Sequence, residues 1–441
     1  MDKVYFVSLG CDKNLCDTEH ILFDLRKRGF EIAEYPAEAR IIVINTCSFI
    51  EDALQESIDT VVEMGAYKEQ GLCELLLICG CMGQRFSSEI CDELPEVDAV
   101  IGTNSWDELC EVIDELLEKK PATPIVRKKE LTGHPKASGR LRTDPIPASF
   151  LKIAEGCDKR CTYCIIPYIR GGYRSVPMEE LLDEARELVA SGVTEISLVA
   201  QEVTLYGIDI YGKKSLVTLI KKLSEIEGLS WIRLLYCYPE EIDDDLIAEI
   251  AENKKLCHYI DMPIQHCNDD ILRRMGRRTN KADIVRIVER LRETVPDIAI
   301  RTTLITGFPG ESEEAHREMI DFVRQMSFDR LGCFSYSRED GTPAADFEDQ
   351  IDRDTADAWA AEIMEAQREL TLQKNKNIIG STLSCFVEGR IEDGVYVARS
   401  YRDAPGVDAS VFIETDEELI SGDIIKTKIV EADGYDLIGD T

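Results

Sequence analysis

The chain has 441 residues and carries 85 acidic against 51 basic side chains, which gives a formal net charge of −34. That length is too great for one ordinary hydrophobic core and indicates about three domains. The acidic balance argues against general binding to phosphate backbones and favours basic partners. The basic runs at 127–129 and 273–278 have two interpretations. They are either solvated or ion-paired surface, or a local basic patch that could still bind nucleic acid.

The hydropathy of the chain and its use of cysteine indicate the cellular compartment in which the protein is expected. No segment reaches the roughly 18 uninterrupted apolar residues that a membrane span requires. The first residues turn polar too soon for a signal peptide, so we expect a cytoplasmic protein. Thiols stay reduced in that compartment, and grouped members of the 16 cysteines are therefore better interpreted as metal or redox ligands than as disulfides.

The first domain is expected over residues 1–120. Short buried runs at 4–9, 41–44, 75–79 and 97–101 are typical of parallel strands, and amphipathic stretches with helical periodicity separate them. This alternation predicts a doubly wound βα domain, a parallel sheet with helices on both faces. Residues 121–148, rich in Lys, Pro, Gly and Thr, lack apolar periodicity and predict a linker.

A second run of βα units is expected over 149–375, with helices such as 177–190 and 311–326 after the strands. Six such units predict an open partial barrel, two units short of the closed eight-fold form. The predicted strands lie near 150–154, 196–200, 231–236, 259–262, 298–305 and 330–336.

The remaining residues, 376–441, follow a long helical stretch at 355–377. They alternate in hydropathy and carry turn signals at 392–394, 421–423 and 433–434. This pattern predicts a small antiparallel β-barrel of OB-like size. The overall fold class is therefore α/β with a C-terminal β-barrel.

Cys157, Cys161 and Cys164 form a CxxxCxxC triplet just after the first strand of the partial barrel. Three thiolates leave one iron of a 4Fe-4S cluster without a protein ligand, and that iron can bind a substrate or cofactor. Structural zinc is the alternative, but it requires four ligands and no nearby cysteine pair completes such a set. The spacing therefore predicts chemistry at a cluster.

A second set of cysteines, Cys11, Cys47 and Cys81, follows three predicted parallel strands of the first domain. The carboxyl ends of adjacent strands converge, so these thiols would form another tripod with an open iron, and neighbouring glycines allow close approach. The pattern alone leaves open that they are small buried apolar side chains. That second interpretation is the one given to Cys16, Cys73, Cys79, Cys91 and Cys110.

The CxxxCxxC run, with Tyr163 directly before its last cysteine, resembles the signature of the radical S-adenosylmethionine (SAM) enzymes. The resemblance implies that SAM chelates the open iron and is cleaved to methionine and a 5′-deoxyadenosyl radical. A core ion pair is the alternative for Arg233, and a plain strand-to-helix connection is the alternative for the turn at 307–310. The SAM contacts implied at later strand ends are Gln201 and Glu202 to the amino group, Arg233 to the carboxylate or ribose, Gln265, and the turn with Gly307 and Phe308 to the adenosine.

Three further motifs, Ser-Leu-Gly-Cys-Asp-Lys-Asn, Asn-Thr-Cys and Gly-Cys-Met-Gly-Gln, are similar to those of the methylthiotransferase family. The resemblance covers nearly the whole chain. It implies that Cys11, Cys47 and Cys81 hold a second 4Fe-4S cluster whose open iron carries the sulfur, and that residues 376–441 form a substrate-binding TRAM barrel. It also implies two SAM molecules per turnover, one as methyl donor and one as radical source.

The tail discriminates between branches of this family, of which most modify transfer RNA and one modifies an aspartate of the twelfth small-subunit ribosomal protein. Residues 381–441 hold 14 acidic and 5 basic side chains, a net charge of −9, which suits a basic protein better than RNA. Mere solubility is the alternative interpretation of that charge. The segments 13–19 and 398–413 resemble the ribosomal-protein branch, while Asp12 and Ala409 depart from it, at positions usually held by Pro and Gly.

We therefore predict a methylthiotransferase that inserts sulfur and a methyl group at the β-carbon of that ribosomal aspartate, by a 5′-deoxyadenosyl radical mechanism. A transfer-RNA adenosine methylthiotransferase is the alternative enzyme, and a two-cluster electron carrier is the alternative of another class. The expected partners are the basic ribosomal protein and a small redox protein as electron donor. The protein is expected to be a monomer with no membrane contact, and nucleic acid is not its primary partner.

Overall fold

A six-stranded parallel sheet forms the N-terminal part of the chain, in the order β2-β1-β3-β4-β5-β6. The computed structural model describes residues 2–441. The strands β3 and β4 are buried along their whole length because helices cover both faces of the sheet. The strands are β1 (Lys3–Ser8), β2 (Glu31–Ile32), β3 (Ile41–Thr46), β4 (Leu75–Gly80), β5 (Ala99–Ile101) and β6 (Ile125–Arg127).

Side chains alternate between two hydrophobic cores, one on each face of this sheet. Ile41 and Val43 lie in one core and Ile42 and Ile44 in the other, as the two-residue period of a strand requires. The doubly wound arrangement predicted from the sequence is confirmed. The covering helices are α1 (Asp12–Lys27), α2 (Glu51–Glu69), α3 (Cys81–Arg85), α4 (Ser87–Glu93) and α5 (Leu109–Lys119).

Two strands of this sheet were not predicted. β2 has two residues and β6 has three, and β6 pairs with β5 from within the stretch 121–148 that the sequence indicates as a linker. Strands this short carry too few residues to show a periodic pattern.

A second six-stranded parallel sheet follows the chain order, β7-β10-β11-β12-β13-β14, so that each new strand joins the same edge. Polar side chains cap several of the helices that connect its strands. Asn280 accepts a hydrogen bond from the amide of Asp283, and Ser312 accepts one from the amide of Ala315, which satisfies amides at helix starts that lack partners within the helix. The strands are β7 (Ala148–Lys152), β10 (Glu195–Val199), β11 (Trp231–Leu234), β12 (Leu256–Asp261), β13 (Ala299–Thr306) and β14 (Arg330–Ser335).

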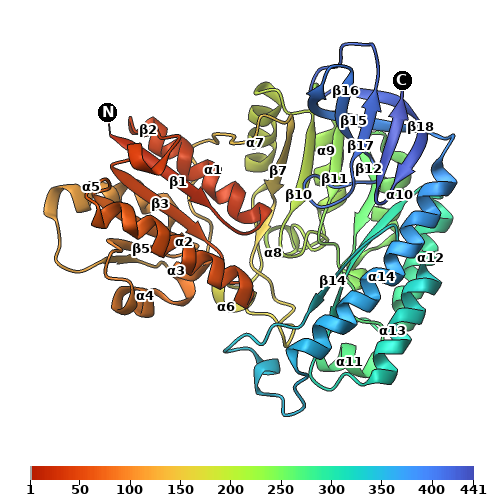
Figure 1. Cartoon of the computed structure of the whole chain (residues 1–441), viewed down its shortest axis with the longest axis horizontal. Coiled ribbons are helices and arrows are strands. Elements are labelled where there is room, and N and C mark those ends of the chain that lie inside the picture. Colours follow the sequence, from red (N-terminus) through yellow and green to blue (C-terminus); the bar gives the residue numbers. More distant parts are fainter. Residues whose placement is uncertain (1) are drawn as a thin grey trace. The chain divides into compact units, whose positions relative to one another are not determined.

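This sheet is the open partial barrel expected from six βα units. In Figure 1 the long helix α14 runs beside α13 and β14 before the chain enters the C-terminal barrel. The helices are α7 (Met178–Ala190), α8 (Ile208–Tyr211), α9 (Leu216–Ser224), α10 (Asp244–Glu252), α11 (Asp269–Arg274), α12 (Lys281–Thr294), α13 (Glu313–Met326) and α14 (Arg353–Ile378).

The last five strands close into a small barrel in the order β15-β16-β17-β19-β18. The expectation of an antiparallel barrel holds for four pairings, whereas β17 and β19 pair in parallel and close the barrel. Local hydropathy does not encode which strand closes a barrel, so the sequence could not show this pairing. The strands are β15 (Thr382–Glu392), β16 (Val395–Ser400), β17 (Val411–Glu414), β18 (Ile424–Asp433) and β19 (Asp436–Asp440).

The chain divides into two compact units that do not follow its linear order. One unit contains the N-terminal sheet together with 154–176 and 337–342, and the other contains the central sheet and the C-terminal barrel. Within the first unit, residues 154–176 include a two-stranded antiparallel ribbon and a short helix. These are β8 (Ala154–Glu155), β9 (Arg174–Ser175) and α6 (Ile166–Ile169).

Candidate iron-sulfur and SAM site

Three cysteines gather at the carboxyl edge of the N-terminal sheet. Cys11 comes after β1, Cys47 after β3 and Cys81 after β4, and these three strands are neighbours. Cys47 and Cys81 are buried, while Cys11 is exposed. Burial, together with the adjacent Cys81 and Cys11, raises the pKa of Cys47 to about 12. The three thiols are thus close enough to influence one another, and their role as cluster ligands stays a prediction.

Two glycines with positive φ angles permit this close approach. Gly10 has a φ of +87°, and a Cβ there would lie 2.9 Å from the Cβ and 3.2 Å from the Sγ of Cys47. Gly80 has a φ of +91°, and its Cβ would lie 2.7 Å from the carbonyl oxygen of Thr46. A larger residue would be strained at both positions and would displace a neighbour of the thiols. The thiols in this glycine cradle are the donor type of an iron-sulfur cluster that keeps one open iron, and this ligand role of the three cysteines stays a prediction.

The second triplet lies in the loop between β8 and β9. The amide of Cys157 donates a hydrogen bond to the carbonyl of Gly171 at 3.1 Å, and the amide of Cys164 donates to the carbonyl of Cys161 at 3.1 Å. Gly156, directly before the first cysteine, has a φ of +78°, and a Cβ there would lie 2.6 Å from the carbonyl oxygen of Gly171. The loop is therefore folded back on itself, with Cys157 and Cys161 buried and Cys164 half-buried.

Both triplets belong to the same compact unit, because residues 154–176 pack with the N-terminal sheet. Among residues 2–441, no group of three His, Cys, Asp or Glu side chains is arranged to hold a metal ion. The six predicted ligands are all thiols, the donor type of iron-sulfur clusters and not of carboxylate sites for hard cations, and their arrangement around a cluster stays a prediction.

In the other unit, polar residues follow the strands of the central sheet. Gln201 and Glu202 come directly after β10, and the buried Glu202 carboxylate accepts a hydrogen bond from the amide of Thr204 at 3.0 Å. Gln265 comes after β12 with a φ of +71°, its amide donating to the carbonyl of Thr303 at 2.9 Å. Among the described residues its side-chain oxygen has no hydrogen-bond partner.

The turn after β13 is stabilised by the carboxylate of Glu311, which follows it directly. The amide of Gly307 donates to the Glu311 carboxylate at 2.6 Å. Gly307 has a φ of +70°, and its Cβ would lie 3.0 Å from the Cα of Ala356, so the turn requires glycine. Phe308 is fully buried and packs edge-on against Tyr336 at 5.5 Å between ring centroids. Phe308 therefore packs in the core beneath the turn. Tyr163, the other aromatic residue implied at the SAM site, lies in the cysteine loop and is half-buried.

Arg233, in β11, makes several contacts with buried groups. Its side chain is fully buried and pairs with Glu195 at 3.0 Å, and it donates to the carbonyl of Tyr401 at 2.8 Å. The guanidinium also lies over the ring of Tyr259, 4.7 Å from the centroid. Arg233 thus forms the core ion pair that was its alternative interpretation, and its contact with SAM stays a prediction.

The tail segment 398–413, whose motif resembles the ribosomal-protein branch, is partly a structural anchor. Three of its charged side chains are tied to the central sheet. Arg399 pairs with Glu195 at 2.5 Å, and Arg330 donates to Asp403 at 2.8 Å. The hydroxyl of Tyr259 donates to Asp408 at 2.8 Å, and Arg301 lies 3.3 Å from the same carboxylate. These side chains are occupied inside the molecule.

Asn14 and Arg170 were not predicted, although they contact the first cysteine set. Arg170 lies 3.4 Å from the Sγ of Cys81, and Asn14 lies 3.9 Å from the same atom. Asn14 ends the motif Ser-Leu-Gly-Cys-Asp-Lys-Asn but was given no role of its own, and for Arg170 the only sequence signal was its position shortly after Cys164.

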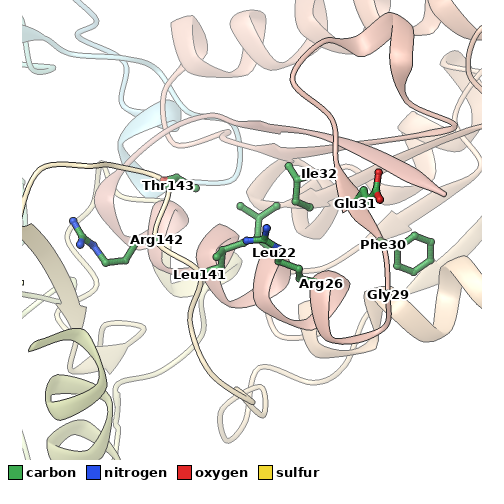
Figure 2. A pocket seen from close by; sticks show the side chains of 9 residues that line it. All are labelled: Leu22, Arg26, Gly29, Phe30, Glu31, Ile32, Leu141, Arg142 and Thr143. Atoms are coloured by element: carbon green, nitrogen blue, oxygen red, sulfur yellow. The ribbon is translucent and has the colours of Figure 1, made fainter. Parts of the chain in front are cut away.

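A hollow of about 710 Å³ lies in the N-terminal unit, and none of the six predicted ligand cysteines lines it (Figure 2). Its wall mixes apolar side chains with two arginines and includes none of the predicted site residues. It is lined by Leu22, Arg26, Gly29, Phe30, Glu31, Ile32, Leu141, Arg142 and Thr143.

Over the described range 2–441, no helix combines the length and apolar character needed to cross a membrane.

Three known families match successive parts of the chain. The radical SAM superfamily matches residues 151–323, the TRAM domain matches residues 379–441, and the family described as "Uncharacterized protein family UPF0004" matches residues 3–102. The match at 151–323 contains the CxxxCxxC triplet, and the match at 3–102 contains Cys11, Cys47 and Cys81.

Solved structures with a similar fold include two radical SAM enzymes. A radical S-adenosylmethionine methyltransferase, TsrM, from Kitasatospora setae has a TM-score of 0.58 at 16% identity, over 92% of this chain and 78% of that chain. The cobalamin-dependent radical enzyme OxsB has a TM-score of 0.54 at 13% identity, over 83% of this chain and 56% of that chain. At these identities the likeness shows the shared fold alone.

Relatives of high identity span the whole chain, and each is named ribosomal protein uS12 methylthiotransferase RimO. The protein from Lachnoclostridium phytofermentans is 50% identical over 99% of both chains. That from Acetivibrio thermocellus is 48% identical over 99% of this chain and 98% of its own. That from Geobacter sulfurreducens is 45% identical over 100% of this chain and 98% of its own. These matches confirm the predicted enzyme class, and the chain belongs to the family of ribosomal protein uS12 methylthiotransferases RimO, which are radical SAM enzymes.

Proposed function

We propose that this protein attaches a methylthio group to the β-carbon of an aspartate in ribosomal protein uS12. Full-length relatives at 45–50% identity are named ribosomal protein uS12 methylthiotransferases. The structural observation that carries the proposal is the presence of two cysteine triplets in one compact unit. Each triplet offers three thiols and leaves one iron of a cluster open, so one can serve SAM and the other can serve sulfur.

The radical SAM family implies one 4Fe-4S cluster and SAM, and we assign that cluster to Cys157, Cys161 and Cys164. The finer part of the proposal is a second cluster on Cys11, Cys47 and Cys81, supported by the glycine cradle around them. When bound, these groups supply reductive cleavage of SAM together with the sulfur and methyl that are transferred.

Residues at the carboxyl ends of the central strands are proposed to bind SAM. Gln201, Glu202 and Gln265 offer carbonyl and carboxylate oxygens that can accept hydrogen bonds from the SAM amino group. The turn beginning at Gly307 allows close approach of the adenosine to the backbone, since a side chain there would meet Ala356. Tyr163 would lie beside the cluster through its neighbour Cys164.

The surface of the C-terminal barrel supports a basic protein as substrate. Nine of its acidic side chains are exposed against three basic ones, Arg390, Lys426 and Lys428. Such a surface attracts a basic ribosomal protein and repels the phosphates of transfer RNA. The exposed acids are Glu392, Asp393, Glu414, Asp416, Glu417, Glu418, Glu431, Asp433 and Asp440.

The remaining parts of the proposal concern organisation and partners. We propose that residues 1–120, 149–375 and 376–441 act as the auxiliary-cluster, radical SAM and substrate-binding domains. A small redox protein would deliver the electron, and the enzyme would work as a cytoplasmic monomer.

The test is anaerobic reconstitution with iron and sulfide, followed by incubation with SAM and reductant. The substrates are a peptide from the uS12 loop, the same peptide with its aspartate replaced by asparagine, and transfer RNA. We expect a mass gain of about 46 Da, the exchange of H for SCH3, on the aspartate peptide alone. A gain on transfer RNA instead would establish the alternative enzyme, and no gain on either substrate with SAM cleavage intact would reject the methylthio chemistry.

A further inference from the structure

Arg170 is a buried arginine in the loop that carries the CxxxCxxC triplet. It follows α6, and its side chain is only 2% exposed. A guanidinium so far from solvent requires acceptors and negative charge on its edges. The groups that surround the guanidinium therefore indicate which parts of the site Arg170 connects.

Two carboxylates hold one edge of this guanidinium. The Nη1 atom donates to Asp17 Oδ2 at 2.9 Å and to Glu155 Oε2 at 3.1 Å. Both carboxylates are themselves buried, with side chains 6% and 7% exposed. This edge fixes the position and the charge of the arginine.

The other edge faces the first cysteine set. The Nη2 atom donates to Asn14 Oδ1 and lies 3.4 Å from Cys81 Sγ. The amide nitrogen of Asn14 in turn donates to the carbonyls of Leu9 and Thr46, each at 3.0 Å. These carbonyls stand just before Gly10-Cys11 and just before Cys47. Arg170 thus touches one thiol directly and is linked through Asn14 to the two strand ends that present the others.

The backbone around Arg170 belongs to the second cysteine set. The next residue, Gly171, accepts the hydrogen bond from the Cys157 amide at 3.1 Å. Glu155, which binds the guanidinium, stands two positions before Cys157. One side chain therefore connects the loop of one triplet to a thiol of the other, within a single compact unit.

We propose that Arg170 is a positioning residue for sulfur insertion, which donates a hydrogen bond to the Cys81 thiolate and fixes the auxiliary cysteines relative to the radical SAM loop. The inference rests on the proposed function, in which Cys11, Cys47 and Cys81 hold a cluster. A cation and an N–H donor at a ligating thiolate stabilise the more negative, reduced state of such a cluster, so Arg170 raises its reduction potential. The planar fork of arginine suits this place, because it serves the carboxylates and the Asn14–Cys81 pair at once.

The experiment observes the auxiliary cluster alone. The full chain with Cys157, Cys161 and Cys164 all replaced by Ala is reconstituted anaerobically, and its reduction potential is measured by titration followed by electron paramagnetic resonance. The same measurement is made after adding Arg170→Gln or Arg170→Lys. We expect a more negative potential in both, with the smaller shift for Arg170→Lys because it keeps the charge.

Arg140→Gln is the matched control. Arg140 is also buried, pairs with Glu19 at 2.6 Å and lies 3.5 Å from the Sγ of Cys16, a cysteine that is not a predicted ligand. The substitution Arg140→Gln removes one positive charge from the same compact unit, as Arg170→Gln does, but leaves the contacts of Cys81 unchanged. A shift for the Arg170 variants no larger than that for Arg140→Gln would overturn the proposal.

Three further outcomes are decisive. If Arg170→Gln does not fold, Arg170→Lys decides, since it keeps a positive charge beside Asp17 and Glu155. If the protein lacking the CxxxCxxC thiols takes up no iron, the auxiliary cluster itself is rejected and the role of Arg170 with it. If the auxiliary cluster forms but its reduction potential does not change in the Arg170 variants, only the role of Arg170 is rejected.

Discussion

Glu195 and Arg399 lie 204 positions apart in the chain and form a buried ion pair, with 2.5 Å between Oε2 and Nη2. Glu195 begins β10 of the central sheet, and Arg399 lies in β16 of the C-terminal barrel. Arg233 of β11 donates to the other oxygen of the same carboxylate at 3.0 Å. One carboxylate therefore binds two buried guanidiniums and joins the barrel to the sheet, and Arg399 also pairs with Glu388 at 2.5 Å.

Replacement of Glu195 by Gln should destabilise the protein strongly, because it leaves the buried Arg233 without its carboxylate and Arg399 with Glu388 alone. We expect a loss of about 3–5 kcal/mol in the free energy of unfolding, measured by chemical denaturation. The matched control is Asp183→Asn, which breaks the exposed pair of Asp183 with Arg186 and should cost less than about 1 kcal/mol. A loss for Glu195→Gln as small as that of the control would show that the pair does not fix the barrel.

The stability that Glu195 contributes should also depend on pH. Burial alone would raise the pKa of Glu195, but Arg399 and Arg233 outweigh it and hold that pKa below the usual 4.5. A group with a lowered pKa in the folded state stabilises the protein above its unfolded pKa and loses that contribution as the pH falls through the folded value. The difference in unfolding free energy between the wild type and Glu195→Gln should therefore be complete at neutral pH and shrink below pH 4.5. A difference that grows on acidification would contradict the assignment.

The two cysteine sets should be separable by their products. Replacing Cys157, Cys161 and Cys164 with Ala should abolish formation of 5′-deoxyadenosine, measured by chromatography, because the cluster that reduces SAM is lost while the auxiliary cluster does not bind SAM. Replacing Cys11, Cys47 and Cys81 instead should spare SAM cleavage and stop sulfur insertion. Sulfur insertion that survives this second change would refute the auxiliary cluster.

The control for both cysteine variants is Cys110→Ala in α5. Cys110 is buried and was predicted to be an ordinary apolar side chain, so its replacement should leave both products unchanged.

The strand ends that carry the cysteines could be predicted, because β1, β3 and β4 are apolar runs with a cysteine just after each and parallel strands share one carboxyl edge. The partners of buried charges could not. Arg233 stands in an apolar run in the manner of a ligand-binding residue, yet its partners are Glu195 and the carbonyl of Tyr401. Such pairs join distant positions, and no local pattern records them.

The same limit applies to Arg170. Its distance in sequence from Asn14 and Cys81 is 156 and 89 positions, so only the packing of the cysteine loop against the N-terminal sheet reveals the contact. The loop at 154–176 follows the first strand of the central sheet in sequence but packs with the other unit.

The glycine cradle should be testable by comparing two glycines of similar backbone conformation. Gly10→Ala places a Cβ 2.9 Å from the Cβ of Cys47, whereas Gly29→Ala, at a φ of +93°, meets nothing within 4 Å. Both changes should cost about 1 kcal/mol of stability through the positive φ. Only Gly10→Ala should also lower the iron bound by the first cysteine set, measured in the protein that lacks the CxxxCxxC thiols. Equal iron content in the two variants would show that the cradle does not shape the site.

Replacing Gln265 with Gly should affect protein stability and SAM binding in opposite directions. Its φ of +71° is unfavourable for a residue with a side chain, and its side-chain oxygen has no partner among residues 2–441. Strain of this kind costs about 1–3 kcal/mol and persists where function requires the side chain. Gln265→Gly should therefore keep or raise the melting temperature while it weakens SAM binding, measured by equilibrium dialysis with the reconstituted enzyme. Gln265→Ala should weaken SAM binding equally without the gain in stability, because alanine keeps the strain. If both variants bind SAM as the wild type does, Gln265 is not part of the SAM site.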